Sequence, residues 1–259
     1  MITQRLCIRY QVLFKVATAT LLLFAFGFAE RSNAQESRSI ELQIEEMGGP
    51  KNLEEMESWL TNFYRSPRPD KVVPLAARSF AYFDSKRQSP VPILLFLAEL
   101  FQKHPDRLNQ WIEQTQLFPQ YRSRFWEALW IAQTPATISL ITQLRESSAD
   151  GDNRSQIGTI MEVVPLKPRS MPINTPESID AMWGAFYAAG EDWPIIRLVD
   201  VIDANVNGRP GNSEGQFIRG AMWSLSSHVR NHPRVKEILL TEIAKRPKLR
   251  AQLFAITRE

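Results

Sequence analysis

The stretch PESIDAMWGAFYAAGEDWPIIRLVDVI, residues 176–202, decides the fold class. Apolar side chains recur every three to four positions over 178–190 and again over 195–202, which is the period of an α-helix. The small residues Ala189 and Gly190 separate the two periods, and Thr175 followed by proline is a favourable helix start. We therefore predict two helices joined by a tight turn.

The same helical period recurs along the rest of the chain. It covers residues 51–65, 92–101, 121–133 and 216–229. Prolines at 105, 135, 176, 233 and 247 separate successive helices, because the residue before proline avoids the helical region while proline itself suits the first turn. Hairpin turns and sustained apolar–polar alternation are missing from the sequence. It therefore predicts an all-α fold of short helix hairpins, stacked as an irregular α-solenoid or as a compact helical array.

Residues 176–202 resemble a tetratricopeptide-type hairpin, with a small-residue turn and Trp193 opening the return helix. The resemblance covers one hairpin, and the chain lacks that family's fixed 34-residue period, so HEAT-like packing is equally open. The whole chain, with MWGAFYAAGED followed by WSLSSHVRNHPRV, also resembles uncharacterised exported bacterial helical proteins. Neither resemblance implies catalytic residues.

The first 34 residues have the order of a secretory signal peptide. Basic residues up to Lys15 precede the apolar run of residues 16–29, and Ser32 and Ala34 are small residues suited to cleavage before Gln35. The apolar run is too short to span a bilayer as a helix, which needs about 20 residues. We expect cleavage after Ala34 and a periplasmic or secreted protein without stable membrane insertion.

Composition excludes several function classes. The single cysteine, Cys7, lies in the predicted leader, so disulfides, Cys-ligated zinc and a Cys nucleophile are excluded from the mature chain. Of the 31 basic and 28 acidic residues, four and one lie in residues 1–34, which leaves 27 of each. A balanced charge gives no general attraction to phosphate, so we expect no nucleic-acid partner.

Residues 148–175 interrupt the helical pattern with the polar run SADGDNRS and three spaced prolines, which predicts a long loop. The predicted organisation is a signal peptide over 1–34, an acidic segment over 35–50, a helical half over 51–147, a Pro-rich loop over 148–175 and a second helical half over 176–259. Charge is unevenly spread, since residues 35–60 are acidic and residues 230–259 are basic. The two ends could attract each other, form separate binding faces, or be merely solvated.

A calcium site is the best metal candidate. In DANVNGRPGNSE, residues 203–214, the donors Asp203, Asn205, Asn207 and Glu214 resemble an EF-hand loop. Pro210 departs from the pattern, because that position normally carries an aliphatic residue. Two carboxylates imply weak affinity, about 10⁻⁴ to 10⁻³ M. The alternative is an Asn/Gly-rich turn whose last acid favours a helix start.

Other motifs favour structural roles. GNSEG at 211–215 matches Gly-x-Ser-x-Gly, but a nucleophile elbow needs a preceding strand. His228 and His232 have helical spacing without the glutamate of a zinc protease. Trp126 and Trp130 could stack on a sugar or a peptide if exposed, and we expect them in the core.

The sequence therefore predicts an exported helical-repeat-like binding or scaffold protein of the cell envelope, with a protein or peptide partner, no cofactor and no catalytic activity. Two alternatives stay open. The first is a weak calcium-binding module at 203–214, and the second is a cell-wall hydrolase or lyase.

Overall fold

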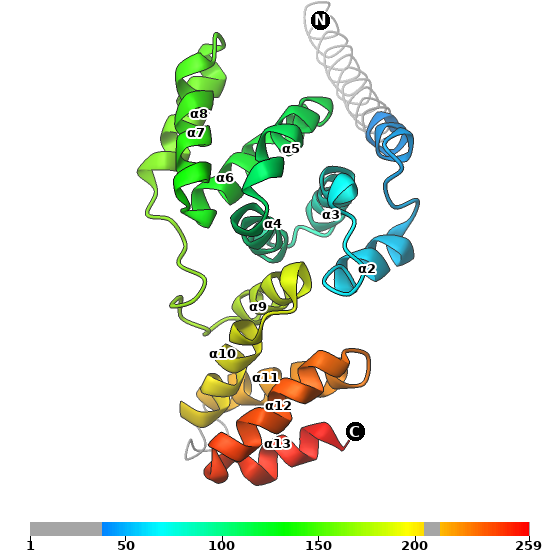
Figure 1. The fold of residues 1–259 in the computed structure, drawn as a ribbon, viewed down its shortest axis with the longest axis vertical. Coiled ribbons are helices and arrows are strands. Elements are labelled where there is room, and N and C mark those ends of the chain that lie inside the picture. Colours follow the sequence, from blue (N-terminus) through cyan, green and yellow to red (C-terminus); the bar gives the residue numbers. More distant parts are fainter. Residues whose placement is uncertain (1–37, 205–212, 259) are drawn as a thin grey trace, which may run out of the picture.

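The computed structural model describes residues 38–204 and 213–258, with side chains at 213–216 excepted (Figure 1). Every regular element in these ranges is a helix, and no β-strand occurs among them. The predicted all-α fold is confirmed. The described residues contain no helix that is both long and apolar enough to cross a bilayer.

The chain begins with a helix whose described part covers residues 38–46. The α-helices that follow are α2 (Leu53–Thr61), α3 (Val72–Ser85), α4 (Val91–Lys103), α5 (Leu108–Gln114), α6 (Arg122–Ala132), α7 (Pro135–Ser147), α8 (Gly151–Glu162), α9 (Pro176–Ala189), α10 (Asp192–Ala204), α11 (Ser213–Val229), α12 (Pro233–Lys245) and α13 (Arg250–Thr257). Short 3₁₀ turns are η1 (Pro69–Lys71), η2 (Pro105–Arg107), η3 (Thr115–Leu117), η4 (Pro119–Tyr121) and η5 (Pro247–Leu249).

Prolines and threonines start helices as predicted. The backbone N–H of Thr137 donates to Oγ1 of Thr134 at 3.2 Å, and that of Ser178 donates to Oγ1 of Thr175 at 3.2 Å. Each threonine thereby satisfies an otherwise unpaired donor of the first helical turn, and proline follows at the first helical position. The turn after α9 is also as predicted, because Gly190 adopts a left-handed conformation with φ of 63°.

The centre of the molecule is the crossing of α4 and α9, which are far apart in the sequence (Figure 1). The helix at 92–101 is buried almost all round, as its composition predicts. A Cβ atom at Gly184 of α9 would lie 1.9 Å from the carbonyl oxygen of Pro92, so the two backbones touch at this point. One apolar cluster runs through both helical halves, and they therefore share a single core.

The prediction of a loop over 148–175 is wrong for its first half, because Gly151–Glu162 form α8. The carboxylate of Asp150 accepts from the backbone N–H of Asp152 at 2.9 Å, so the polar segment that looks like a linker is a helix N-terminus. Ile157 and Gly158 are buried on the face that packs toward α6 and α7. Residues 163–175 contain turns and no helix, because their prolines prevent one.

In the second half, helices pack on more than their neighbours in the chain. α10 contacts both α11 and α12, and α11 contacts α13 as well as α12. Helices two apart in the sequence therefore lie next to each other.

Candidate functional site

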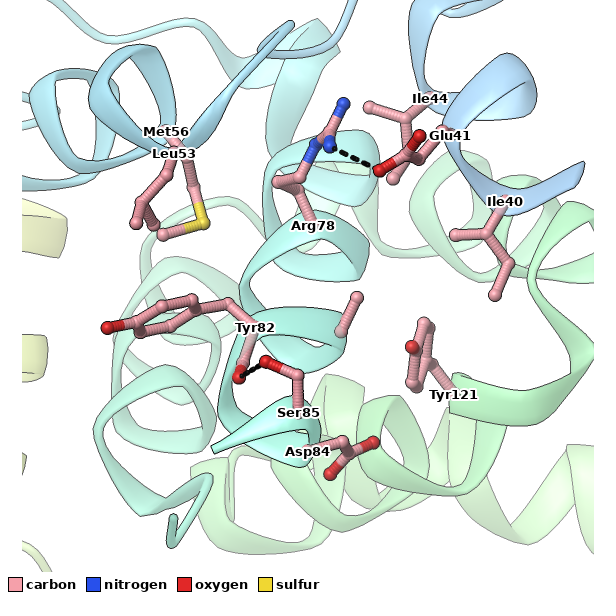
Figure 2. Close-up of a pocket in the computed structure, with 11 residues that line it drawn as sticks. Ile40, Glu41, Ile44, Leu53, Met56, Arg78, Tyr82, Asp84, Ser85 and Tyr121 are labelled. Atoms are coloured by element: carbon pink, nitrogen blue, oxygen red, sulfur yellow. Dashed lines mark hydrogen bonds and ion pairs between the residues drawn. The ribbon is translucent and has the colours of Figure 1, made fainter. Parts of the chain in front are cut away.

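An apolar pocket of about 490 Å³ lies between the helix at 38–46, α2 and α3 (Figure 2). Its size falls in the range of about 300–1,000 Å³ that is usual for ligand sites. It is lined by Ile40, Glu41, Ile44, Leu53, Met56, Arg78, Ala81, Tyr82, Asp84, Ser85 and Tyr121. We call it the N-terminal pocket.

Two basic side chains form hydrogen bonds with the segment that follows the helix at 38–46. Arg78 of α3 donates to the carbonyl oxygens of Pro50 at 3.2 Å and of Lys51 at 3.1 Å. Lys71 donates to the carbonyl oxygen of Met47 at 2.8 Å. Gly49 passes so close to Ile44 and to α3 that a Cβ atom there would lie 2.7 Å from the Ile44 side chain. The connection between the first two helices is therefore held against α3.

The polar groups of the pocket are largely used within the protein. Arg78 has only 13% of its side chain exposed and lies 3.5 Å from the carboxylate of Glu41. Asp84 pairs with Arg124 at 2.6 Å, and the hydroxyl of Ser85 donates to the carbonyl oxygen of Tyr82 at 2.7 Å. A ligand would therefore meet mainly apolar side chains and tyrosine rings.

The helices beside the N-terminal pocket carry exposed leucines and carboxylates. Leu53 lines the pocket and is 42% exposed, and Leu42 of the helix at 38–46 is 54% exposed. Residues 38–57 contain two basic residues, Arg38 and Lys51, and six acidic ones. The acidic residues are Glu41, Glu45, Glu46, Glu54, Glu55 and Glu57. An apolar depression with carboxylates on the helices beside it is suited to an apolar group that carries positive charge beside it.

The histidine pair lies in an aromatic cluster where the two halves meet. The His228 ring stacks on Trp183 with centroids 3.7 Å apart, and it lies 5.8 Å from the His232 ring. The hydroxyl of Tyr64 is 3.2 Å from Nδ1 of His232. Burial lowers the pKa of both histidines, that of His232 to about 4. Both rings are therefore neutral near pH 7, and their contacts here are structural. Tyr187 completes the cluster.

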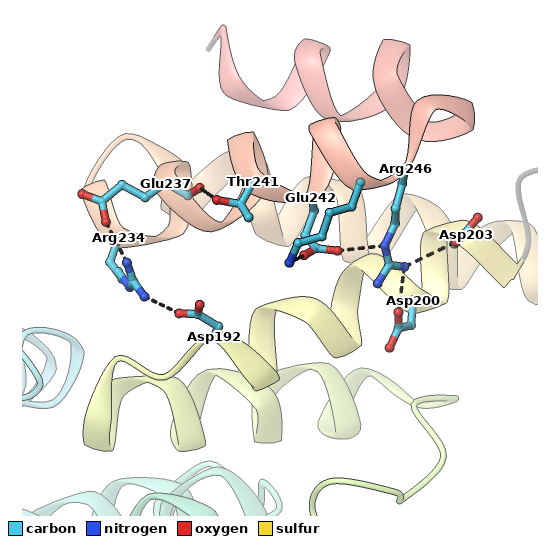
Figure 3. A network of polar contacts seen from close by, with 9 residues as sticks. Asp192, Asp200, Asp203, Arg234, Glu237, Thr241, Glu242 and Arg246 are labelled. Atoms are coloured by element: carbon cyan, nitrogen blue, oxygen red, sulfur yellow. Dashed lines mark hydrogen bonds and ion pairs between the residues drawn. The ribbon is translucent and has the colours of Figure 1, made fainter.

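The calcium candidate lies only partly within the described residues. Asn205 and Asn207 and the side chain of Glu214 are outside them. The carboxylate of Asp203 at the end of α10 is 3.4 Å from Nη1 of Arg246 (Figure 3). A cation already faces Asp203, which reduces the negative charge that this residue could offer to calcium.

Arg246 is the centre of a larger ionic network (Figure 3). Its guanidinium also lies 2.7 Å from Asp200 of α10 and 2.8 Å from Glu242 of α12, whose side chain is buried. These contacts connect the end of α12 to α10. No group of three or more His, Cys, Asp or Glu side chains suited to a metal ion occurs in 38–204 or in the described side chains after it.

Ser213 of the Gly-x-Ser-x-Gly match is the first residue of α11, and residues 205–212 before it lie outside the described range. A serine at the start of a helix, in a chain whose described part holds no strand, lacks the sheet that positions a nucleophile elbow.

The tryptophans divide between core and surface. Trp126 is 3% exposed and belongs to the core, as predicted. Trp130 is half-buried, donates from Nε1 to the carbonyl oxygen of Val163 at 2.8 Å, and lines a second cavity of about 250 Å³. They do not form an exposed pair. The exposed tryptophan is Trp223 of α11, at 73%.

A buried carboxyl, Glu99 of α4, was not singled out from the sequence. Only 3% of Glu99 is exposed, and burial raises its pKa from 4.5 to about 7. The neighbouring Glu191 lies 2.5 Å from Lys103 and 3.2 Å from Arg169, and the hydrogen bond from Lys103 lowers its pKa. The run LFLAELF could have drawn attention to this residue, because it places one acid in an otherwise apolar helix.

Comparisons with protein-family models, with curated proteins and with solved structures found no match for this chain.

Proposed function

We propose that the protein is a non-enzymatic binding or scaffold protein of the cell envelope, and that its N-terminal pocket takes an apolar segment of a partner protein. The observation that carries this proposal is the 490 Å³ pocket, whose lining includes Leu53, a leucine that is 42% exposed. Most of its polar groups are paired within the protein, so it supports binding of apolar side chains better than catalysis.

The charge beside the pocket indicates which class of partner would bind. Residues 38–57 contain six glutamates and two basic residues. An amphipathic helix with leucines on one face and lysines beside them would bury its apolar face and keep its charges near the carboxylates. The partner is therefore a cationic amphipathic segment.

Fluorescence anisotropy with two labelled model helices tests this proposal. One peptide places leucines on one face and lysines elsewhere, and the other replaces every lysine by glutamate. We expect the lysine peptide to bind more tightly by roughly tenfold or more, because each unfavourable charge pair across an interface weakens binding. Equal binding of both peptides contradicts the charge argument.

A matched pair of variants locates the binding. Leu53 is 42% exposed at the pocket, and Leu117 is 46% exposed in η3, outside the pocket lining. Leu53→Asn should weaken lysine-peptide binding by roughly tenfold without changing the charge, while Leu117→Asn should leave it unchanged. A photo-crosslinking residue at each position in living cells gives the second readout. Partner adducts that form equally at both positions contradict binding in the pocket.

A further inference from the structure

The outer side of α11 carries one stripe of exposed side chains. Arg219, Trp223 and Ser227 are exposed and follow one another at four-residue intervals, so they lie along the same face of the helix. Ala221 and Leu225 are buried on the other side. Trp223 is 73% exposed, which is unusual for tryptophan, a residue that is highly buried on average.

A second exposed stripe lies on α13, which contacts α11. Arg250, Ala255 and Arg258 are exposed, and the guanidinium of Arg250 lies 5.6 Å from the centre of the half-buried Phe254 ring. α11 and α13 contact each other, and both also contact α12. Because their side chains are exposed, the two stripes lie outside these helix contacts. We call these residues the α11–α13 face.

The α11–α13 face is basic. Residues 217–229 and 250–257 contain no Asp or Glu. Arg219, Arg250 and Arg258 form no ion pair within the part of the chain that the structure describes. The helix at 38–46, which carries Glu41, Glu45 and Glu46, lies at the opposite end of the molecule from α13 (Figure 1).

We propose that the α11–α13 face binds the surface of a bilayer that contains anionic phospholipids. Such a surface presents phosphates for arginine and lysine side chains, and directly beneath them an interfacial layer in which an indole ring is favourable. The face combines both features, because Trp223 and Arg219 are exposed on the same stripe of α11, and Arg250 and Arg258 are exposed on α13, which contacts α11. This binding is peripheral, and it is independent of the pocket proposal.

Vesicle co-sedimentation tests the proposal. The purified protein is mixed with vesicles of phosphatidylcholine alone or with about one third phosphatidylglycerol, at low and at high salt. We expect binding only to the anionic vesicles, and weaker binding at high salt because the charges are screened. Each of Arg219→Gln and Arg250→Gln should lower the partition constant about fivefold. Trp223→Ser should lower it roughly tenfold or more.

Matched controls isolate the face. Lys86→Gln removes an exposed charge at the end of α3 and should leave vesicle binding unchanged. Leu53→Asn should also leave it unchanged, so that failure of the pocket proposal and failure of this one are distinguishable. All variants share residues 1–34 and their processing, so any contribution of that segment cancels. Circular dichroism confirms that each variant is folded.

Three results overturn the proposal. One is equal binding to neutral and anionic vesicles, and another is an effect of Lys86→Gln as large as that of Arg219→Gln. Unchanged binding by Trp223→Ser also contradicts it, and would assign the exposed tryptophan to a protein partner instead.

Discussion

The buried carboxyl Glu99 should make the protein less stable as the pH rises. Its pKa is about 7 in the folded protein and 4.5 in its ordinary state, mainly because burial disfavours the charged form. The positive charges of Arg169 and Lys103 lower the pKa of Glu99 and partly offset the effect of burial, whereas the negative charge of Glu191 raises it further. Between pH 4.5 and 7 the folded state holds the proton more tightly than the unfolded state. The contribution of Glu99 to the free energy of unfolding is therefore complete below pH 4.5 and is lost as the pH rises through 7.

Replacement by glutamine gives the size of the effect. The difference between a pKa of 4.5 and about 7 corresponds to about 3 kcal/mol. Glu99→Gln keeps the shape of the protonated acid and cannot ionise. At about pH 8.5, we expect the variant to exceed the wild type by about 3 kcal/mol in free energy of unfolding, or roughly 6–12 °C in Tm. At about pH 4.5 the two should agree within about 1 kcal/mol.

Urea denaturation followed by circular dichroism at both pH values measures this difference. The comparison of variant with wild type removes the contributions of other titrating groups, such as His232. Glu113→Gln, at an exposed position of α5, is the control and should show the same difference from wild type at both pH values. A Glu99→Gln effect of equal size at both pH values refutes the reasoning, because it would show that ionisation of this carboxyl is not what costs stability.

Three further predictions concern the core, the aromatic cluster and the calcium candidate. Gly184→Ala should lower the free energy of unfolding by about 3 kcal/mol, because its Cβ would overlap the carbonyl oxygen of Pro92. Gly151→Ala is the control and should leave the free energy of unfolding unchanged, because there is open space around Gly151. Equal effects of the two substitutions contradict the close helix crossing. His232 has a pKa lowered to about 4, chiefly by burial, so its stability contribution is complete above pH 6.5 and is lost as the pH falls toward 4. His232→Asn should therefore make urea unfolding less sensitive to acid, and an unchanged acid sensitivity contradicts this. Millimolar calcium should raise Tm if residues 203–214 form a site, and Glu214→Gln should abolish the rise; no shift in the wild type rejects the site.

Much of the secondary structure could be predicted from the sequence, because it depends on neighbours within a few residues. The helical period of residues 178–190 and the start signals at Thr134 and Thr175 act within one or two turns, and the structure confirms them. The error at α8 has a different origin. The polar segment before Ile157 has the composition of a linker, and only packing of Ile157 and Gly158 against other helices makes it a helix.

The candidate site depended on the tertiary structure. The helical period over 51–65 is visible in the sequence, but the sequence does not say that Leu53 stays exposed at a pocket wall while Met56 is buried. The pKa of Glu99 and the contact of Asp203 with Arg246 also depend on segments distant in the chain. Periodicity and capping are local properties that short stretches of sequence determine. Burial, charge pairing and cavities arise only when distant helices pack, so the sequence alone determined the helices and the tertiary structure decided which of their faces remain open.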